Sequence, residues 1–195
     1  MKILGIVCSP REGGNTEILV REALEGVRDA GGEPELVLLS GKEIAPCDAC
    51  GGCEKNGQCI VEDDMQDIYE KLESADGLIF GTPVYFLNVS AQAKAVMDRT
   101  FGFLRTRRLK GKVAAAIVAV RRVGAGQVLS LLYTFFAIHR MVIAGGGIGY
   151  GREKGEVREG PGGSPEVTAL QEARAVGKNV VKMARRLGKE NKGRP

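Results

Sequence analysis

The sequence predicts an α/β fold with a doubly wound parallel sheet, and two features of its pattern carry that prediction. Five short apolar runs alternate along the chain with five segments whose apolar residues recur at helical spacing. The runs are apolar at almost every position, which is typical of parallel strands that helices bury on both faces. Turn residues separate the runs, so each run is expected to form one strand.

Each predicted element has a local signal. The first strand ends at turn residues, and the helix after it has apolar residues at positions 19, 20, 23, 24 and 27 before Gly31-Gly32 stops it. The strands are predicted at Lys2–Cys8, Glu35–Ser40, Gly77–Gly81, Lys112–Val120 and Met141–Ala144. The helices are predicted at Thr16–Ala30, Asp63–Ser74, Ser90–Thr100, Gln127–His139 and Pro165–Leu187. Five strands with this spacing favour the flavodoxin-like order 2-1-3-4-5, with helices on both faces, over a six-stranded dinucleotide-binding fold.

The organisation of the chain is expected to be simple. A length of 195 residues with 44% hydrophobic composition suits one domain with a substantial core. No internal repeat or linker interrupts residues 1–187, which are expected to form that domain, and the basic tail 188–195 is expected to fray. The glycine-rich segment Gly145–Gly163 is expected to be a mobile loop or a segment ordered by a partner subunit.

Composition and charge narrow the class of protein. No apolar stretch approaches the roughly 20 residues of a membrane-spanning helix, and the short N-terminal apolar run lacks a cleavage site, so a cytoplasmic protein is expected. The formal charge is +4, concentrated in residues 105–110 and in the tail after Lys178. These charges are expected to be solvated surface or a docking patch for an acidic protein partner. Aromatic residues make up 5% and Trp is absent, which argues against nucleic-acid binding.

The loop after the first strand has the composition of a phosphate cradle. It reads Ser-Pro-Arg-Glu-Gly-Gly-Asn-Thr over residues 9–16 and runs directly into a helix. The free N–H groups and positive dipole end of a helix N-terminus bind anions, and neither a Walker loop nor a G-x-G-x-x-G fingerprint is present. The candidate phosphate ligands are Ser9, Arg11, Gly14, Asn15 and Thr16. The alternative is that Ser9 or Asn15 only caps the helix.

These residues resemble the phosphate loop of the NADPH-dependent FMN reductase family. A second signature of that family follows at Gly81–Phe86 and in the helix that opens at Ser90 and reaches Asp98-Arg99. The resemblance implies a flavin-dependent oxidoreductase that binds FMN along Thr82, Pro83, Val84, Tyr85 and Phe86. The alternative for Tyr85 and Phe86 is that they fill the core.

A third flavin loop is expected after the fourth strand. Arg121, Gly124 and Gly126 are the candidates, because glycines let the backbone approach the flavin closely. Arg121 or Arg122 is expected to stabilise a negatively charged reduced flavin. No catalytic side chain is expected, since the cofactors carry the chemistry, and Cys8 and His139 are interpreted as structural.

Four cysteines form a compact motif at residues 47–59. Cys47, Cys50, Cys53 and Cys59 follow the spacing C-x2-C-x2-C-x5-C, with glycines between them. In a reducing compartment such a cluster is more often metal-binding or catalytic than a disulfide framework. Four thiolates on one short loop suit a [4Fe–4S] cluster; zinc is the second hypothesis, and a redox-active dithiol or an empty loop is the third.

This cysteine spacing resembles the iron–sulfur flavoprotein branch of the same family. The resemblance implies a homodimer or homotetramer with the cluster near the subunit interface, and electrons that pass between cluster and FMN. It implies a ferredoxin-like donor and a small acceptor such as dioxygen, hydrogen peroxide or a quinone. Because the second strand neighbours the first, the cysteine loop is expected on the same rim of the sheet as the phosphate cradle.

Other functions are compatible with the same residues. One is an NAD(P)H-dependent FMN or quinone reductase whose cysteine loop is structural or binds zinc. Another is an electron carrier without a substrate of its own, and a third is an iron or redox sensor that regulates a partner.

Overall fold

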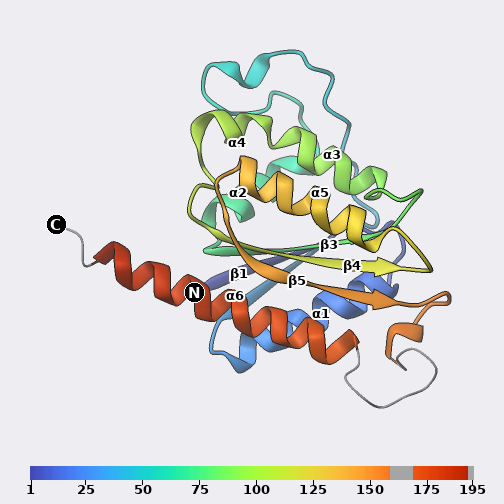
Figure 1. The fold of residues 1–195 in the computed structure, drawn as a ribbon. Coiled ribbons are helices and arrows are strands. Elements are labelled where there is room, and N and C mark those ends of the chain that lie inside the picture. Colours follow the sequence, from blue (N-terminus) through green and yellow to red (C-terminus); the bar gives the residue numbers. More distant parts are fainter. Residues whose placement is uncertain (159–168, 193–195) are drawn as a thin grey trace.

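A parallel sheet of five strands lies at the centre of the computed structural model, which describes residues 1–158 and 169–192 (Figure 1). The strands are β1 (Lys2–Val7), β2 (Glu33–Leu38), β3 (Gly77–Pro83), β4 (Val113–Val120) and β5 (Val142–Tyr150). Their order in the sheet is β2-β1-β3-β4-β5, and every neighbouring pair is parallel. The predicted flavodoxin-like strand order is therefore confirmed.

Helices cover both faces of the sheet, as predicted. One face carries α1 (Asn15–Asp29) and α6 (Ala169–Lys192), and the other carries α2 (Met65–Ser74), α3 (Ala91–Arg99) and α5 (Ala125–Ile138) (Figure 1). The short helix α4 (Phe101–Thr106) and the 3-10 turns η1 (Gly52–Glu54) and η2 (Glu156–Arg158) complete the described elements. Within these residues, no helix is long and apolar enough to cross a membrane.

The central strand β4 shows how the sheet divides the core. All eight of its residues are buried. Side chains alternate between the two faces of a strand, so Ala114, Ala116 and Val118 join the core under α2, α3 and α5. Val113 and Ile117 join the core under α1 and α6.

The glycine-rich stretch after Ala144 was predicted as a loop, and that prediction is wrong for its first part. β5 continues to Tyr150, with a bulge at Gly145, whose φ is +118°. A Cβ on Gly146 would lie 2.7 Å from the side chain of Leu129 and 2.8 Å from that of Tyr133, both on α5. The glycines are therefore strand residues over which a helix packs closely, a use of glycine that composition alone does not distinguish from a turn.

Other boundaries also differ from the predictions. α4 and η1 were not predicted, and β2 lies about two residues earlier than expected. α6 continues to Lys192, past its predicted end at Leu187, so the expected frayed tail is helical up to that residue. The predicted start of that helix at Pro165 lies outside the described residues.

Candidate functional site

The loop between β1 and α1 leaves a helix N-terminus open. Gly14 is the N-cap residue of α1, and no side chain caps the helix there. The Arg11 N–H donates to Ser9 Oγ at 3.1 Å, which folds the loop into a tight turn. The first N–H groups of a helix lack partners within the helix, so this end of α1 can receive an anion.

The carboxylate of Glu17 holds the loop between β1 and α1 in place. It accepts hydrogen bonds from the Gly13 N–H at 2.6 Å and from Arg21 Nε at 2.8 Å. Burial raises the pKa of Glu17, but the hydrogen bonds from Arg21 and Gly13 outweigh that effect and the pKa is lowered. The carboxylate therefore stays ionised and holds the turn in place.

Asn15 connects the loop to the segment that follows β5. Its Nδ2 donates to the Glu153 carbonyl oxygen at 2.8 Å, and its Oδ1 accepts from the Gly155 N–H at 2.8 Å. The oxygen and the nitrogen of the amide thus both hold this segment. The segment brings Lys154 next to the loop, because a Cβ added to Gly13 would lie 3.0 Å from Lys154 Nζ. Sequence reasoning missed Lys154, although it follows a strand that ends at the same edge as β1.

These elements enclose a cavity of about 390 Å³ at the carboxyl edge of the sheet. This volume lies within the usual range of small-molecule sites. The predicted residues that line it are Ser9, Arg11, Gly14, Asn15, Thr16, Pro83, Val84, Tyr85 and Arg121. The lining residues that were not predicted are Ala119, Val120, Gly151, Arg152, Glu153 and Lys154. The cavity therefore has a cationic end beside α1 and an apolar wall made by the ends of β3 and β4.

Four predicted flavin residues do not line this cavity. Thr82 is fully buried, and its Oγ1 accepts from the Ser90 N–H at 3.2 Å. Ser90 Oγ in turn donates to the Cys8 carbonyl oxygen, so this pair ties the start of α3 to the end of β1. Gly124 is the N-cap of α5 with φ +99°, and Gly126 has no atom near its Cβ position.

Phe86, the fourth of these residues, lies at the tip of a strained two-residue turn. Tyr85 and Asn88 exchange backbone hydrogen bonds of 2.9 and 3.0 Å around Phe86 and Leu87. Both tip residues have positive φ, +48° and +61°, a conformation that disfavours bulky side chains. Phe86 is fully exposed and Tyr85 is 40% exposed, so the alternative that this pair fills the core is wrong.

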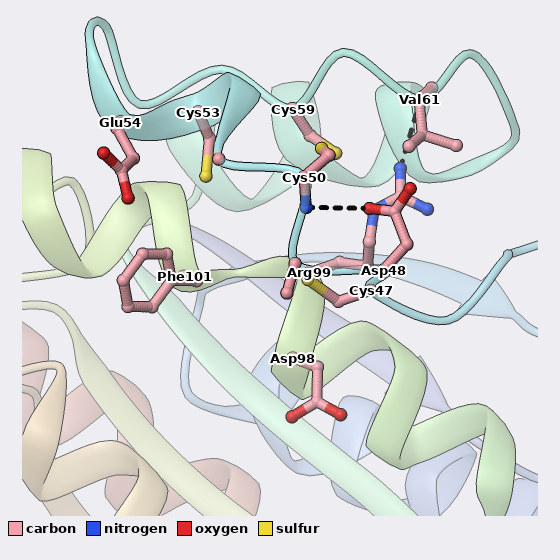
Figure 2. A pocket seen from close by; sticks show the side chains of 12 residues that line it. Cys47, Asp48, Cys50, Cys53, Glu54, Cys59, Val61, Asp98, Arg99 and Phe101 are labelled. Carbon is pink, nitrogen blue, oxygen red and sulfur yellow. Dashed lines mark hydrogen bonds between the residues drawn. The ribbon is translucent and has the colours of Figure 1, made fainter.

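The four cysteines surround a second cavity of about 480 Å³ (Figure 2). The other lining residues are Asp48, Ala49, Gly51, Glu54, Val61, Asp98, Arg99 and Phe101. Across residues 1–158 and 169–192, no group of three or more His, Cys, Asp or Glu side chains is close enough to hold a metal ion. The thiols thus share one cavity without converging on a single coordination point, and all of them are free.

The cysteine cavity does not lie where the strand order predicts it. It sits at the C-terminal end of α3, beside Asp98 and Arg99, whereas Ser90 at the other end of α3 contacts the end of β1. The loop leaves β2 at the expected rim and then folds back over α3 and α4 (Figure 1). The nine residues of α3 span about 13 Å at 1.5 Å rise per residue, so the cysteine cavity lies one helix length from the end of α3 that contacts β1.

Two contacts seat the cysteine loop on the helices below it. Arg99 forms a salt bridge with Asp63 at 2.7 Å, and its guanidinium also donates to the carbonyl oxygens of Ala45 and Val61, which flank the loop. At the outer end, Gly57 and Gly102 approach so closely that a Cβ on Gly102 would lie 2.3 Å from the Gly57 carbonyl oxygen. Sequence reasoning did not identify Arg99 as part of this site.

The family of the chain follows from comparison with known proteins. Residues 1–153 match the NADPH-dependent FMN reductase family. The chain belongs to this family. It is therefore a flavin-dependent oxidoreductase, and its curated relatives place it in the iron–sulfur flavoprotein branch.

Two relatives and one solved structure define this similarity. The chain is 38% identical to an iron-sulfur flavoprotein of Methanocaldococcus jannaschii over 199 residues, which cover 97% of this chain and 100% of the relative. It is 42% identical to an iron-sulfur flavoprotein of Methanosarcina thermophila over 149 residues, 74% of this chain and 78% of the relative. RosB, solved with 8-demethyl-8-formylriboflavin-5'-phosphate, has a TM-score of 0.75 at 19% identity, with coverage of 97% of this chain and 81% of RosB. At that identity the likeness to RosB shows the fold alone.

Proposed function

We propose that this chain passes electrons between a ferredoxin-like one-electron donor, a [4Fe–4S] cluster and FMN, and reduces dioxygen, hydrogen peroxide or a quinone. The observation that supports this most is the presence of two separate cavities in one chain: a cationic one at the open end of α1, and one surrounded by four thiols. The proposal extends to a cytoplasmic homodimer or homotetramer of single-domain subunits.

The first cavity has the donor set that FMN needs. The phosphate of FMN is a dianion near neutral pH. On one side of the cavity, the open N–H groups of α1, together with Arg11 and Lys154, supply positive potential. Pro83, Val84 and Tyr85 form an apolar and aromatic wall on the other side, which suits a flat flavin ring. The lining residues therefore fit FMN at both ends.

The second cavity has the donor set of an iron–sulfur cluster. Soft thiolate ligands select iron–sulfur clusters, Cu(I) or zinc, and four cysteines provide one ligand for each iron of a [4Fe–4S] cluster. Cys47, Cys50, Cys53 and Cys59 would hold the group. Zinc accepts the same four thiolates and is the less favoured occupant.

Each part of the chain has a distinct task in this scheme. When bound, the cluster supplies one-electron transfer and FMN supplies one- or two-electron transfer. Arg121, on the wall of the flavin cavity, is placed to stabilise negative charge on the ring. The exposed tip at Phe86 and Leu87 forms, with Val123, an apolar rim at which a quinone or another small acceptor can approach. α3 links the two cavities through bonds at both of its ends.

Metal and flavin analysis of the protein purified without air tests the proposal. The wild-type chain is expected to contain about four irons, about four sulfides and one flavin per subunit. Cys53→Ser is expected to lose the iron and keep the flavin. Cys8→Ala serves as the matched control, because Cys8 is buried at the end of β1 and its side chain lines neither cavity.

Three results would favour another function. Zinc in place of iron, or flavin without any metal, would leave an ordinary FMN reductase. Steady NADPH oxidation at the same rate in wild type and Cys53→Ser would indicate an NAD(P)H-dependent FMN or quinone reductase. Electron uptake without turnover of any small acceptor would indicate an electron carrier.

A further inference from the structure

Arg99 holds both ends of the cysteine loop with one buried side chain. It is 3% exposed and lies at the end of α3, beneath the cysteine cavity. Its Nη1 donates to the Ala45 carbonyl oxygen at 3.0 Å and to Asp63 Oδ2 at 2.7 Å. Its Nη2 donates to the Val61 carbonyl oxygen at 3.2 Å and to Asp63 Oδ1 at 3.1 Å. The two terminal nitrogens are therefore fully used by the loop and by Asp63.

The third nitrogen of the same guanidinium has no partner. Arg99 Nε is buried and makes no hydrogen bond within the part of the chain that the structure describes. Native proteins rarely leave a buried donor unpaired, because it loses its bonds to water and gains none in return. Since Arg99 lines the cysteine cavity, an acceptor in that cavity is the natural partner for this N–H.

The acceptors that this cavity offers are the sulfur atoms of its four cysteines, or of a group bound to them. The backbone of Arg99 is also fixed at this position, because the Tyr69 hydroxyl donates to the Arg99 carbonyl oxygen at 2.6 Å.

We propose that Arg99 is a positioning residue of the cysteine site, whose Nε–H donates a hydrogen bond to a sulfur atom of the cluster. This inference rests on the proposed function, since it requires a cluster on the four cysteines. Hydrogen bonds to cluster sulfurs help to set the reduction potential, and the groups that orient metal ligands affect how tightly a metal site holds together. Because the donor stabilises the more negative, reduced form, it raises the potential of the cluster.

Three variants separate the hydrogen bond from the general stability of the loop. Arg99→Lys keeps the positive charge beside Asp63 and removes Nε–H. Asp63→Asn weakens the clamp and leaves Nε–H in place. Arg105→Lys makes the same chemical change on the exposed surface of α4 and is the matched control.

The experiment uses the full chain with FMN and cluster loaded, labelled with ¹⁵N-arginine. Pulsed electron paramagnetic resonance of the reduced cluster is expected to detect one arginine nitrogen in wild type, Arg105→Lys and Asp63→Asn, and none in Arg99→Lys. The potential is expected to move to more negative values in Arg99→Lys only. A chelator is expected to remove the cluster about tenfold faster from Arg99→Lys and Asp63→Asn than from wild type.

The outcomes distinguish the two proposals. A wild-type chain that carries no cluster overturns the proposed function and this inference together. A wild-type chain that carries the cluster, but shows no arginine coupling and the same potential as Arg99→Lys, overturns the role of Arg99 alone.

Discussion

Adding one methyl group at Gly102 is expected to release the cysteine loop without disturbing the flavin cavity. A Cβ at this position would lie 2.3 Å from the carbonyl oxygen and 2.8 Å from the carbonyl carbon of Gly57. These are backbone atoms, so the contact cannot be relieved by turning a side chain. Overpacking of this kind costs about 1–3 kcal/mol, and the close distance places Gly102→Ala at the upper end of that range. The higher helix propensity of alanine returns about 1 kcal/mol at most, so a net loss of about 2 kcal/mol is expected.

The assay compares Gly102→Ala with Gly188→Ala. Gly188 lies in α6 with no atom within 4 Å of its Cβ position, so the same change there is expected to stabilise the helix. Urea unfolding measures both effects, and iron and flavin content show which cavity is affected. Gly102→Ala is expected to lose stability and iron and to keep its flavin. Unchanged stability and full iron loading in Gly102→Ala would refute the close seating of the loop on α4.

Further predictions concern stability, pH and cofactor affinity. Asp63→Ala leaves the buried guanidinium of Arg99 without its carboxylate partner, and is expected to lower the free energy of unfolding in urea by about 3–5 kcal/mol. Burial lowers the pKa of His139, so the unfolded chain binds a proton on this histidine at higher pH than the folded chain does. The stability of the fold is therefore expected to fall as pH drops below about 6.5, and His139→Gln is expected to reduce this pH dependence of the melting temperature. Lys154→Gln is expected to weaken FMN binding about tenfold in a fluorescence titration, and an unchanged affinity would remove Lys154 from the phosphate site. Replacing Phe86 and Leu87 by Asn-Gly, the residues that suit this turn, is expected to stabilise the chain by about 1–2 kcal/mol and to slow quinone reduction.

The architecture was predictable because it depends on patterns that repeat along the chain. Apolar runs of strand length and helices of regular spacing determine the strand order and the two faces of the sheet. Composition alone could not show that Gly146 lies in a strand, because the reason is the packing of α5 above it. The short helix α4 likewise depends on a tertiary contact, the close approach of Gly102 to Gly57.

The candidate site was predictable where one loop carries its residues and not where several elements meet. Pro83 lines the cavity at the open end of α1 because it is the last residue of β3, and Arg11 lines it because it lies in the loop that follows β1. Lys154 reaches the same cavity only through Asn15, a contact across more than one hundred residues of chain. Arg99 stood in the family signature, yet its place beneath the cysteines depends on how the loop folds back over α3.

The central claim is that electrons reach the flavin by way of the four cysteines. Anaerobic rapid mixing of the chain with a reduced ferredoxin tests it most directly, with bleaching of the flavin absorbance as the readout. Wild type and Cys8→Ala are expected to bleach at the same rate, whereas Cys53→Ser retains its flavin and bleaches at least about tenfold more slowly. Equal rates in Cys53→Ser and wild type would contradict the account and leave the cysteine loop without a part in electron transfer.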